Sequence, residues 1–82
     1  MSKFIVYCLY SDIHDRLYIG QTGNIEKRYK QHCSGRVIST RKYLPYRIIY
    51  IEEVPDRASA FRREKELKVT SQRKFLRTFI NK

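Results

Sequence analysis

The stretch LYIGQTGNIEKRYKQH, residues 17–32, runs from strand-forming residues through two glycines into a helix. Asn24 suits the helix N-cap, and Gly35 offers a left-handed stop. Three apolar side chains recur between them at a four-residue spacing: Ile25, Tyr29 and Cys33. The stretch therefore predicts a strand, a turn and a helix of about ten residues, on which Arg28 and His32 share one face.

A β-hairpin is predicted in front of this helix. Residues 3–10, KFIVYCLY, form a β-branched and aromatic run, the polar segment 11–16 interrupts it, and residues 17–20 resume the same character. Apolar side chains alternate onto both faces of the first strand, so we expect both faces of the sheet to be covered.

The second half of the chain predicts a further strand and a pair of helices. Residues 36–46 hold turn residues, a proline and basic side chains, which indicates an irregular connection, and residues 47–54 form a strand bounded by Pro55. The apolar spacing predicts helices at 57–69 and 72–80. The candidate N-caps of these helices are Asp56 and Ser71.

The order β-β-α-β-α-α, with a short hairpin at its front, predicts an α+β fold in which helices flank a small three-stranded antiparallel sheet. A chain of 82 residues has room for one core, so we expect a single domain over 1–82. No apolar run approaches the roughly 20 residues of a spanning helix, and the polar start MSK is not a signal peptide.

The charge of the chain indicates a polyanionic partner. Eighteen lysines and arginines stand against eight aspartates and glutamates, which gives a formal net charge of +10. Such a field favours nucleic acid over a membrane surface, and charge that serves only solubility is the alternative. Cys8 and Cys33 are too few for a disulfide framework or a zinc site, so they predict a reducing, cytoplasmic setting with both thiols buried as small hydrophobes.

Glu64 stands out because a carboxylate is unexpected on the apolar face of the predicted second helix. It lies four residues after Ala60 and three before Leu67, in the stripe that also holds Phe61. Two interpretations stay open. Either Glu64 serves a functional site, or it sits at the rim of the core and pairs with Lys68 one turn later.

Aromatic and basic groups can converge with Glu64 on one side of so small a domain. Tyr7 and Tyr18 lie on neighbouring strands, and each hydroxyl needs a partner if it is buried. Arg28 presents a fork of donors suited to a phosphate, and His32 can reach the same ligand. Each residue taken singly is ordinary, whereas together they indicate a site.

The signature segments resemble those of the GIY-YIG nuclease superfamily. The second half of the family's signature is intact as Tyr18, Ile19 and Gly20, and the first half is IVY at residues 5–7, with isoleucine where the name has glycine. The chain is most similar to the short stand-alone branch and to the nuclease module at the start of the nucleotide-excision-repair endonuclease subunit. One departure is Gln21, where excision-repair members have a lysine.

The resemblance spans nearly the whole chain. The segment NIEKRYKQH carries the family's helix arginine as Arg28 and the histidine of the stand-alone branch as His32. The segment RASAFRREKELK matches the part of the family that holds its metal-binding glutamate, which falls on Glu64. This is the carboxylate that already stood out in the helix.

The resemblance implies a metal-dependent endonuclease that hydrolyses phosphodiester bonds, with Mg²⁺ or Mn²⁺ held by Glu64 alone. The catalytic residues that it implies are Tyr7, Tyr18, Arg28, His32 and Glu64. As a hypothesis, Tyr7 is the general base or relays a proton, with its phenol pKa lowered by nearby cations. Tyr18 and His32 would orient water and phosphate, and Arg28 would neutralise the developing charge.

Basic side chains around the site predict a phosphate track. The expected contacts are Arg28, Arg36, Arg41, Lys42 and Lys68. We expect the partner to be nucleic acid that is cut with little sequence specificity; DNA is the first expectation, although the sequence leaves DNA or RNA open. The excision-repair resemblance implies a role in DNA repair. A binding module of the same fold with weak or no catalysis is the main alternative, which Gln21 favours, and a small structural protein is the other. A homodimer would place two sites on two strands, and the sequence leaves the oligomeric state open.

Overall fold

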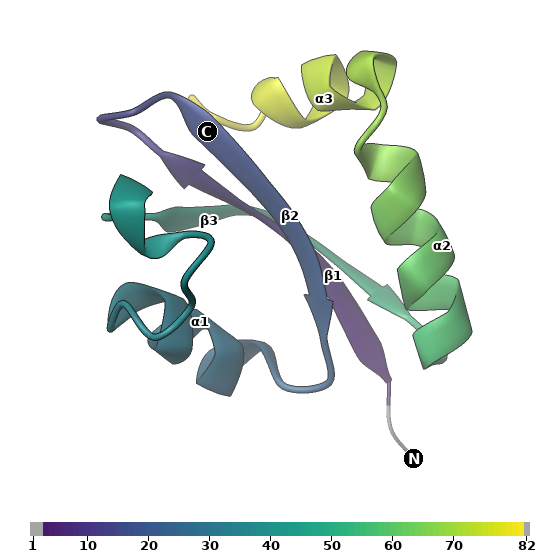
Figure 1. The fold of residues 1–82 in the computed structure, drawn as a ribbon. Coiled ribbons are helices and arrows are strands. Elements are labelled where there is room, and N and C mark those ends of the chain that lie inside the picture. The colour runs from purple at the N-terminus through teal and green to yellow at the C-terminus, as the bar shows by residue number, and fades with distance from the viewer. Residues whose placement is uncertain (1–2, 82) are drawn as a thin grey trace.

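The computed structural model describes residues 3–81, which form a three-stranded antiparallel sheet with helices on both faces (Figure 1). The central strand is β1 (Phe4–Ser11), which pairs with β2 (Arg16–Thr22) on one side and β3 (Arg47–Val54) on the other. The predicted fold class and element order are confirmed, and β3 has the predicted bounds.

Helix α1 (Ile25–Cys33) covers one face of the sheet, whereas α2 (Arg57–Leu67) and α3 (Thr70–Arg77) cover the other (Figure 1). The predicted caps of the first two helices are confirmed. The side chains of Asn24 and Asp56 each accept a backbone N–H of the first helical turn, at 3.1 and 2.8 Å. These caps fix where α1 and α2 begin.

The third helix begins and ends earlier than predicted. It occupies Thr70–Arg77 rather than 72–80, and Val69, not Ser71, holds the N-cap position without a side-chain hydrogen bond. Leu76 is fully buried with the core residues of α2, so the chain has to turn into α3 directly after α2 ends. Tertiary packing overrides the capping preference of Ser71 here.

The side chains of β1 alternate between two core clusters, as the strand's two apolar faces predict. Val6 and Cys8 pack on the side of α2 and α3, and Tyr7 and Leu9 pack on the side of α1 and the connection 36–46. Cys8 is fully buried, and burial raises the pKa of its thiol to about 12. The structural role predicted for Cys8 is therefore confirmed.

Two side chains predicted to be buried are exposed, Cys33 and Phe61. Helix α1 turns His32 toward the sheet, where it is fully buried, and this orientation leaves Cys33 in solvent. Phe61 is 54% exposed, and the Lys65 ammonium lies 4.7 Å from its ring centroid. The prediction for Cys33 failed because an apolar-stripe argument ignores polar residues such as His32, which the core accepts once they are hydrogen-bonded.

Candidate active site

The candidate site is built around the Tyr7 side chain on the central strand. Tyr7 pairs with Gly20 of β2 in the register of the sheet. A Cβ atom at Gly20 would lie 2.7 Å from the Tyr7 hydroxyl oxygen, which is too close for van der Waals contact, and 3.0 Å from Cε2 of Tyr18, which is tighter than most such contacts. The glycine of the Tyr-Ile-Gly segment thus provides the space that both tyrosine rings need.

We expect Gly20→Ala to destabilise the protein by roughly 1–3 kcal/mol, because the added methyl group forces the buried Tyr7 side chain to move. Gly23→Ala is the matched control, since its Cβ would meet only the Phe4 ring at an ordinary distance of 3.6 Å. Urea unfolding of both variants measures the difference. If Gly20→Ala unfolded at the same urea concentration as the wild type, the tyrosine would not be held in place as described.

The Tyr7 hydroxyl and the His32 imidazole form a buried hydrogen-bonded pair. Tyr7 Oη lies 2.9 Å from His32 Nε2, and His32 Nδ1 lies 2.9 Å from Thr40 Oγ1. The Thr40 hydroxyl donates to the carbonyl of Val37 at 3.3 Å, so it accepts the N–H of His32 Nδ1. This assignment leaves His32 Nε2 free of a proton and able to accept the hydroxyl proton of Tyr7.

Burial decides the protonation states of this pair. Burial raises the pKa of Tyr7 to about 12, although the guanidinium of Arg28 opposes the rise. Burial, together with the positive charge of Arg28, lowers the pKa of His32 to about 4. The expectation that nearby cations lower the Tyr7 pKa is therefore wrong, because the loss of water around the phenolate outweighs its attraction to Arg28. At neutral pH Tyr7 keeps its proton and His32 is uncharged.

The buried imidazole predicts a loss of stability in mild acid. The pKa of His32 falls from 6.5 to about 4 on folding, so between these values the unfolded chain binds a proton that the native protein does not. Stability is fully present above pH 6.5 and falls as the pH drops toward 4, by roughly 2–3 kcal/mol. Urea unfolding between pH 7 and 4.5 measures the loss. The dependence should shrink in His32→Gln and persist in His14→Gln, and an unchanged dependence in His32→Gln would assign it to another group.

Tyr18 and Arg28 complete the group on the α1 side of the sheet. The ring centroid of Tyr18 lies 5.0 Å from that of His32 and 6.3 Å from that of Tyr7. Arg28 donates from Nη1 to the Gln31 side chain at 3.0 Å, and its charge acts on Tyr7 and on His32. The structure thus brings together four of the five predicted catalytic residues around one hydrogen bond.

Glu64 approaches this group from α2. Its charge reaches Tyr7, whose pKa it helps to raise, and its carboxylate accepts from Lys68 Nζ at 2.9 Å. The Glu64 side chain is only 21% exposed, compared with 54% for Glu66 two residues later. Glu64 is therefore ion-paired, as one interpretation predicted, and lies within electrostatic reach of Tyr7, as the other requires.

Five further ion pairs occupy most of the remaining carboxylates. They are Lys3–Glu53, Asp12–Arg47, Asp15–Arg77, Glu52–Arg63 and Glu66–Arg63. Within residues 3–81 no group of three or more His, Cys, Asp or Glu side chains could hold a metal ion. Glu64 is the carboxylate whose charge reaches Tyr7, and it could hold a divalent cation there, with water in the other positions, after Lys68 moves aside. This donor set fits magnesium, which keeps most of its waters and often binds one or two carboxylates.

The predicted phosphate contacts are unevenly placed around this group. Arg28 lines two cavities, of about 320 and 630 Å³, and Arg36 lines the larger one. Arg41 and Lys42 are exposed on a short 3-10 helix, Arg41–Tyr43, inside the otherwise irregular connection. Lys68 is engaged with Glu64. Arg28 is therefore the predicted contact whose charge acts on both Tyr7 and His32 and whose side chain also lines cavities.

Sequence reasoning missed two residues of this region, Thr40 and Arg57. Thr40 lies in an irregular connection, where no periodicity shows which side chains are buried, and it is 1% exposed. Arg57 is the first residue of α2, and the sheet brings it to the cavity that Arg28 also lines. No local signal marks either residue, because each gains its role from a long-range contact.

Known proteins match both the sequence and the fold. The sequence profile of the GIY-YIG catalytic domain matches residues 3–77. A UPF0213 protein of Syntrophus aciditrophicus (strain SB) is 36% identical over 75 residues, 88% of this chain and 84% of that protein. A UPF0213 protein of Natronomonas pharaonis is 34% identical over 70 residues, 84% of this chain and 81% of that protein. The solution NMR structure of a UPF0213 protein from Bacillus halodurans is similar, with a TM-score of 0.57 and 27% identity over 95% of this chain and 85% of that chain. The chain therefore belongs to the GIY-YIG family, whose catalytic domain is that of a nuclease superfamily.

Proposed function

We propose that this protein is a metal-dependent endonuclease that hydrolyses phosphodiester bonds of nucleic acid, DNA in preference to RNA, with little sequence specificity. The observation that carries the proposal is the buried Tyr7–His32 hydrogen bond at 2.9 Å, with Arg28, Tyr18 and Glu64 around it. A protein core can pack without such an arrangement, in which an uncharged imidazole accepts a hydrogen bond from a tyrosine hydroxyl next to an arginine and a carboxylate. The arrangement therefore indicates a functional site.

Glu64 is the residue that would hold the divalent cation, Mg²⁺ or Mn²⁺, on which GIY-YIG nucleases generally depend. When bound, such a cation supplies a positive charge that stabilises the phosphoryl oxygens. The negative charge of Glu64 raises the Tyr7 pKa, so neutralising this carboxylate also makes the Tyr7 proton easier to remove.

Tyr7 and His32 provide a path for the proton of the attacking water. With a pKa of about 12, Tyr7 is not a phenolate at neutral pH, so it cannot be a preformed base. In our proposal Tyr7 Oη takes the proton of the water while its own proton passes to Nε2 of His32. Thr40 keeps His32 in the tautomer whose Nε2 can accept that proton.

Arg28 and Tyr18 act on the phosphate in this proposal. The guanidinium of Arg28 can donate to two phosphoryl oxygens and neutralise the charge that develops on them. The Tyr18 ring lies beside the rings of both Tyr7 and His32, and this position supports a role for Tyr18 in orienting the substrate. Gln21 stands where excision-repair members have a lysine. Arg28 and His32 are therefore the candidates for orienting the phosphate or the water in place of that lysine.

A nucleic-acid-binding module without catalysis is the second candidate function, and two observations favour it. Glu64 is paired with Lys68, which competes with a metal ion for the carboxylate. The side-chain oxygen of Gln21 is buried with no hydrogen-bond partner within the described part of the chain, so the amide does not replace a lysine ammonium in an evident way.

The test is cleavage of supercoiled plasmid, branched DNA, single-stranded DNA and RNA by the purified protein, with magnesium or manganese and with chelator. Cutting that needs the metal supports the nuclease and ranks its substrates. Binding without cutting under every divalent cation would instead support the nucleic-acid-binding module.

No helix in residues 3–81 is long and apolar enough to cross a membrane. The proposed setting in cytoplasmic DNA repair, like a homodimer acting on two strands, rests on the resemblance and the sequence alone.

A further inference from the structure

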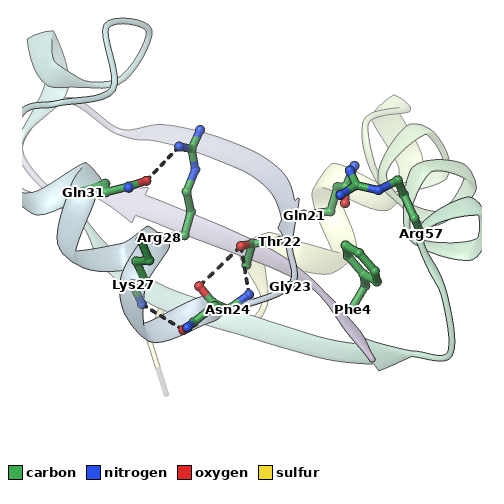
Figure 2. Close-up of a pocket in the computed structure, with 9 residues that line it drawn as sticks. All are labelled: Phe4, Gln21, Thr22, Gly23, Asn24, Lys27, Arg28, Gln31 and Arg57. Carbon is green, nitrogen blue, oxygen red and sulfur yellow. Dashed lines mark hydrogen bonds between the residues drawn. The ribbon is translucent and has the colours of Figure 1, made fainter. Parts of the chain in front are cut away.

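A basic cavity of about 320 Å³ adjoins the catalytic group (Figure 2). Two of its cations, Lys27 and Arg28, come from the start of α1, and the third, Arg57, comes from the start of α2. Figure 2 shows Arg57 beside Phe4 and Gln21, on the wall opposite Arg28. The residues that line the cavity are Phe4, Gln21, Thr22, Gly23, Asn24, Lys27, Arg28, Gln31 and Arg57, and none of them is acidic.

The cations of this cavity differ from those used to hold the fold together. Arg47, Arg63 and Arg77 each form an ion pair with a carboxylate at 2.8 to 3.1 Å. Among the described residues no carboxylate lies within ion-pair distance of Lys27, Arg28 or Arg57. Three positive charges without a carboxylate partner thus face one hollow, and their combined field favours the binding of an anion there.

Two of the three cations are held in place by side chains of the same cavity. The guanidinium of Arg57 stacks over the Phe4 ring at 4.8 Å, and that of Arg28 donates to Gln31 at 3.0 Å. The floor between them is fixed by the Thr22 hydroxyl, which exchanges hydrogen bonds with the backbone of Asn24 at 3.1 and 3.3 Å. The donors are therefore positioned before a ligand arrives, which lowers the entropy cost of binding.

We propose that this cavity binds a second backbone phosphate of the nucleic-acid strand whose scissile phosphate faces Tyr7. The inference rests on the proposed function for its substrate class, and Arg28 links the two positions because it lines the cavity and acts on Tyr7. Arg57 and Lys27 supply the remaining charge from the two walls. A phosphodiester carries a single negative charge, which Lys27 and Arg57 can neutralise while Arg28 serves the scissile phosphate beside it.

The test measures binding of a ten-nucleotide oligothymidylate in the presence of chelator, so that cleavage plays no part. Arg57→Gln and Lys27→Gln, one from each wall, should each weaken binding about 3- to 10-fold and lower the slope of log K against log salt by about 0.7. Arg62→Gln is the matched control, since Arg62 is exposed on the same helix as Arg57 but outside the cavity. Amide spectra of each variant establish that it is folded.

Inorganic phosphate gives a second readout at the level of single residues. Amide signals of Gly23, Asn24 and Lys27 should shift when phosphate replaces chloride at equal ionic strength, and the shifts should decrease in Arg57→Gln. Three outcomes would overturn the cavity proposal. They are a binding loss in Arg62→Gln equal to that in Arg57→Gln, an unchanged salt slope in Arg57→Gln, and no binding by the wild type at low salt. If the wild type binds through this cavity but never cuts, the proposed nuclease activity is overturned and the cavity proposal stands.

Discussion

Glu64→Gln is expected to slow metal-dependent cleavage by about 10³-fold while leaving the fold intact. Glu64 is the carboxylate whose charge acts on Tyr7, and most other carboxylates in residues 3–81 belong to ion pairs elsewhere. Removing the anchor of a catalytic cation removes several kcal/mol of transition-state stabilisation, which corresponds to a loss of about 10³-fold in rate. Initial rates of plasmid nicking with magnesium or manganese measure the loss.

Glu66→Gln is the matched control for this substitution. Glu66 lies on the same helix and is also ion-paired, with Arg63 at 3.1 Å, but its side chain is more than twice as exposed as that of Glu64. We expect its rate to stay within about two-fold of the wild type, because an exposed ion pair contributes little. Metal-dependent cleavage that survived in Glu64→Gln would rule out the proposed metal site and leave the catalytic cation, if any, without a protein ligand.

Tyr7→Phe is expected to slow cleavage by about 10²- to 10⁴-fold, the usual contribution of a positioned acid or base. The substitution keeps the ring that fills the space over Gly20 and removes only the hydroxyl that bonds His32. The buried Nε2 of His32 then loses its donor, so we also expect a loss of about 1–3 kcal/mol in stability. Single-turnover rates under saturating protein separate the chemical step from binding.

Tyr10→Phe controls for the loss of a tyrosine hydroxyl from the same strand. The Tyr10 hydroxyl donates to Asp15 at 2.8 Å in the hairpin region, away from Tyr7 and His32. This variant should lose stability without losing its cleavage rate. Full cleavage by Tyr7→Phe would remove Tyr7 from the proton path and would mean that the space above Gly20 serves only the packing of its ring.

Local pattern was enough to predict the strands and the start of the first two helices. The run 47–54 is bounded by residues that break strands, and Asn24 and Asp56 satisfy the backbone N–H groups that open α1 and α2. Pattern failed where burial depends on the partner surface. Cys33 and Phe61 have the spacing expected of core residues. In the fold, however, His32 is the α1 residue buried against the sheet, and both Cys33 and Phe61 are exposed to solvent.

The predicted site residues depend on both levels. Residue type and spacing marked Tyr7, Tyr18, Arg28, His32 and Glu64 as candidates, and the resemblance to the GIY-YIG family supplied their predicted catalytic roles. Their protonation states are not recognisable in this way. The hypothesis drawn from the sequence was that nearby cations lower the Tyr7 pKa, whereas in the fold Tyr7 is so deeply buried that desolvation raises its pKa to about 12.

The sequence by itself determined the element order, the α+β class, the basic character and the family of this chain, because these follow from local propensities and from residue types at set spacings. Only the tertiary structure decided that His32 is buried against Tyr7, that Thr40 selects its tautomer and that Arg57 meets Arg28 across a cavity. These facts depend on contacts between segments far apart in the chain, and on water excluded by their packing. The pattern of residues along the chain does not specify these contacts or the exclusion of water.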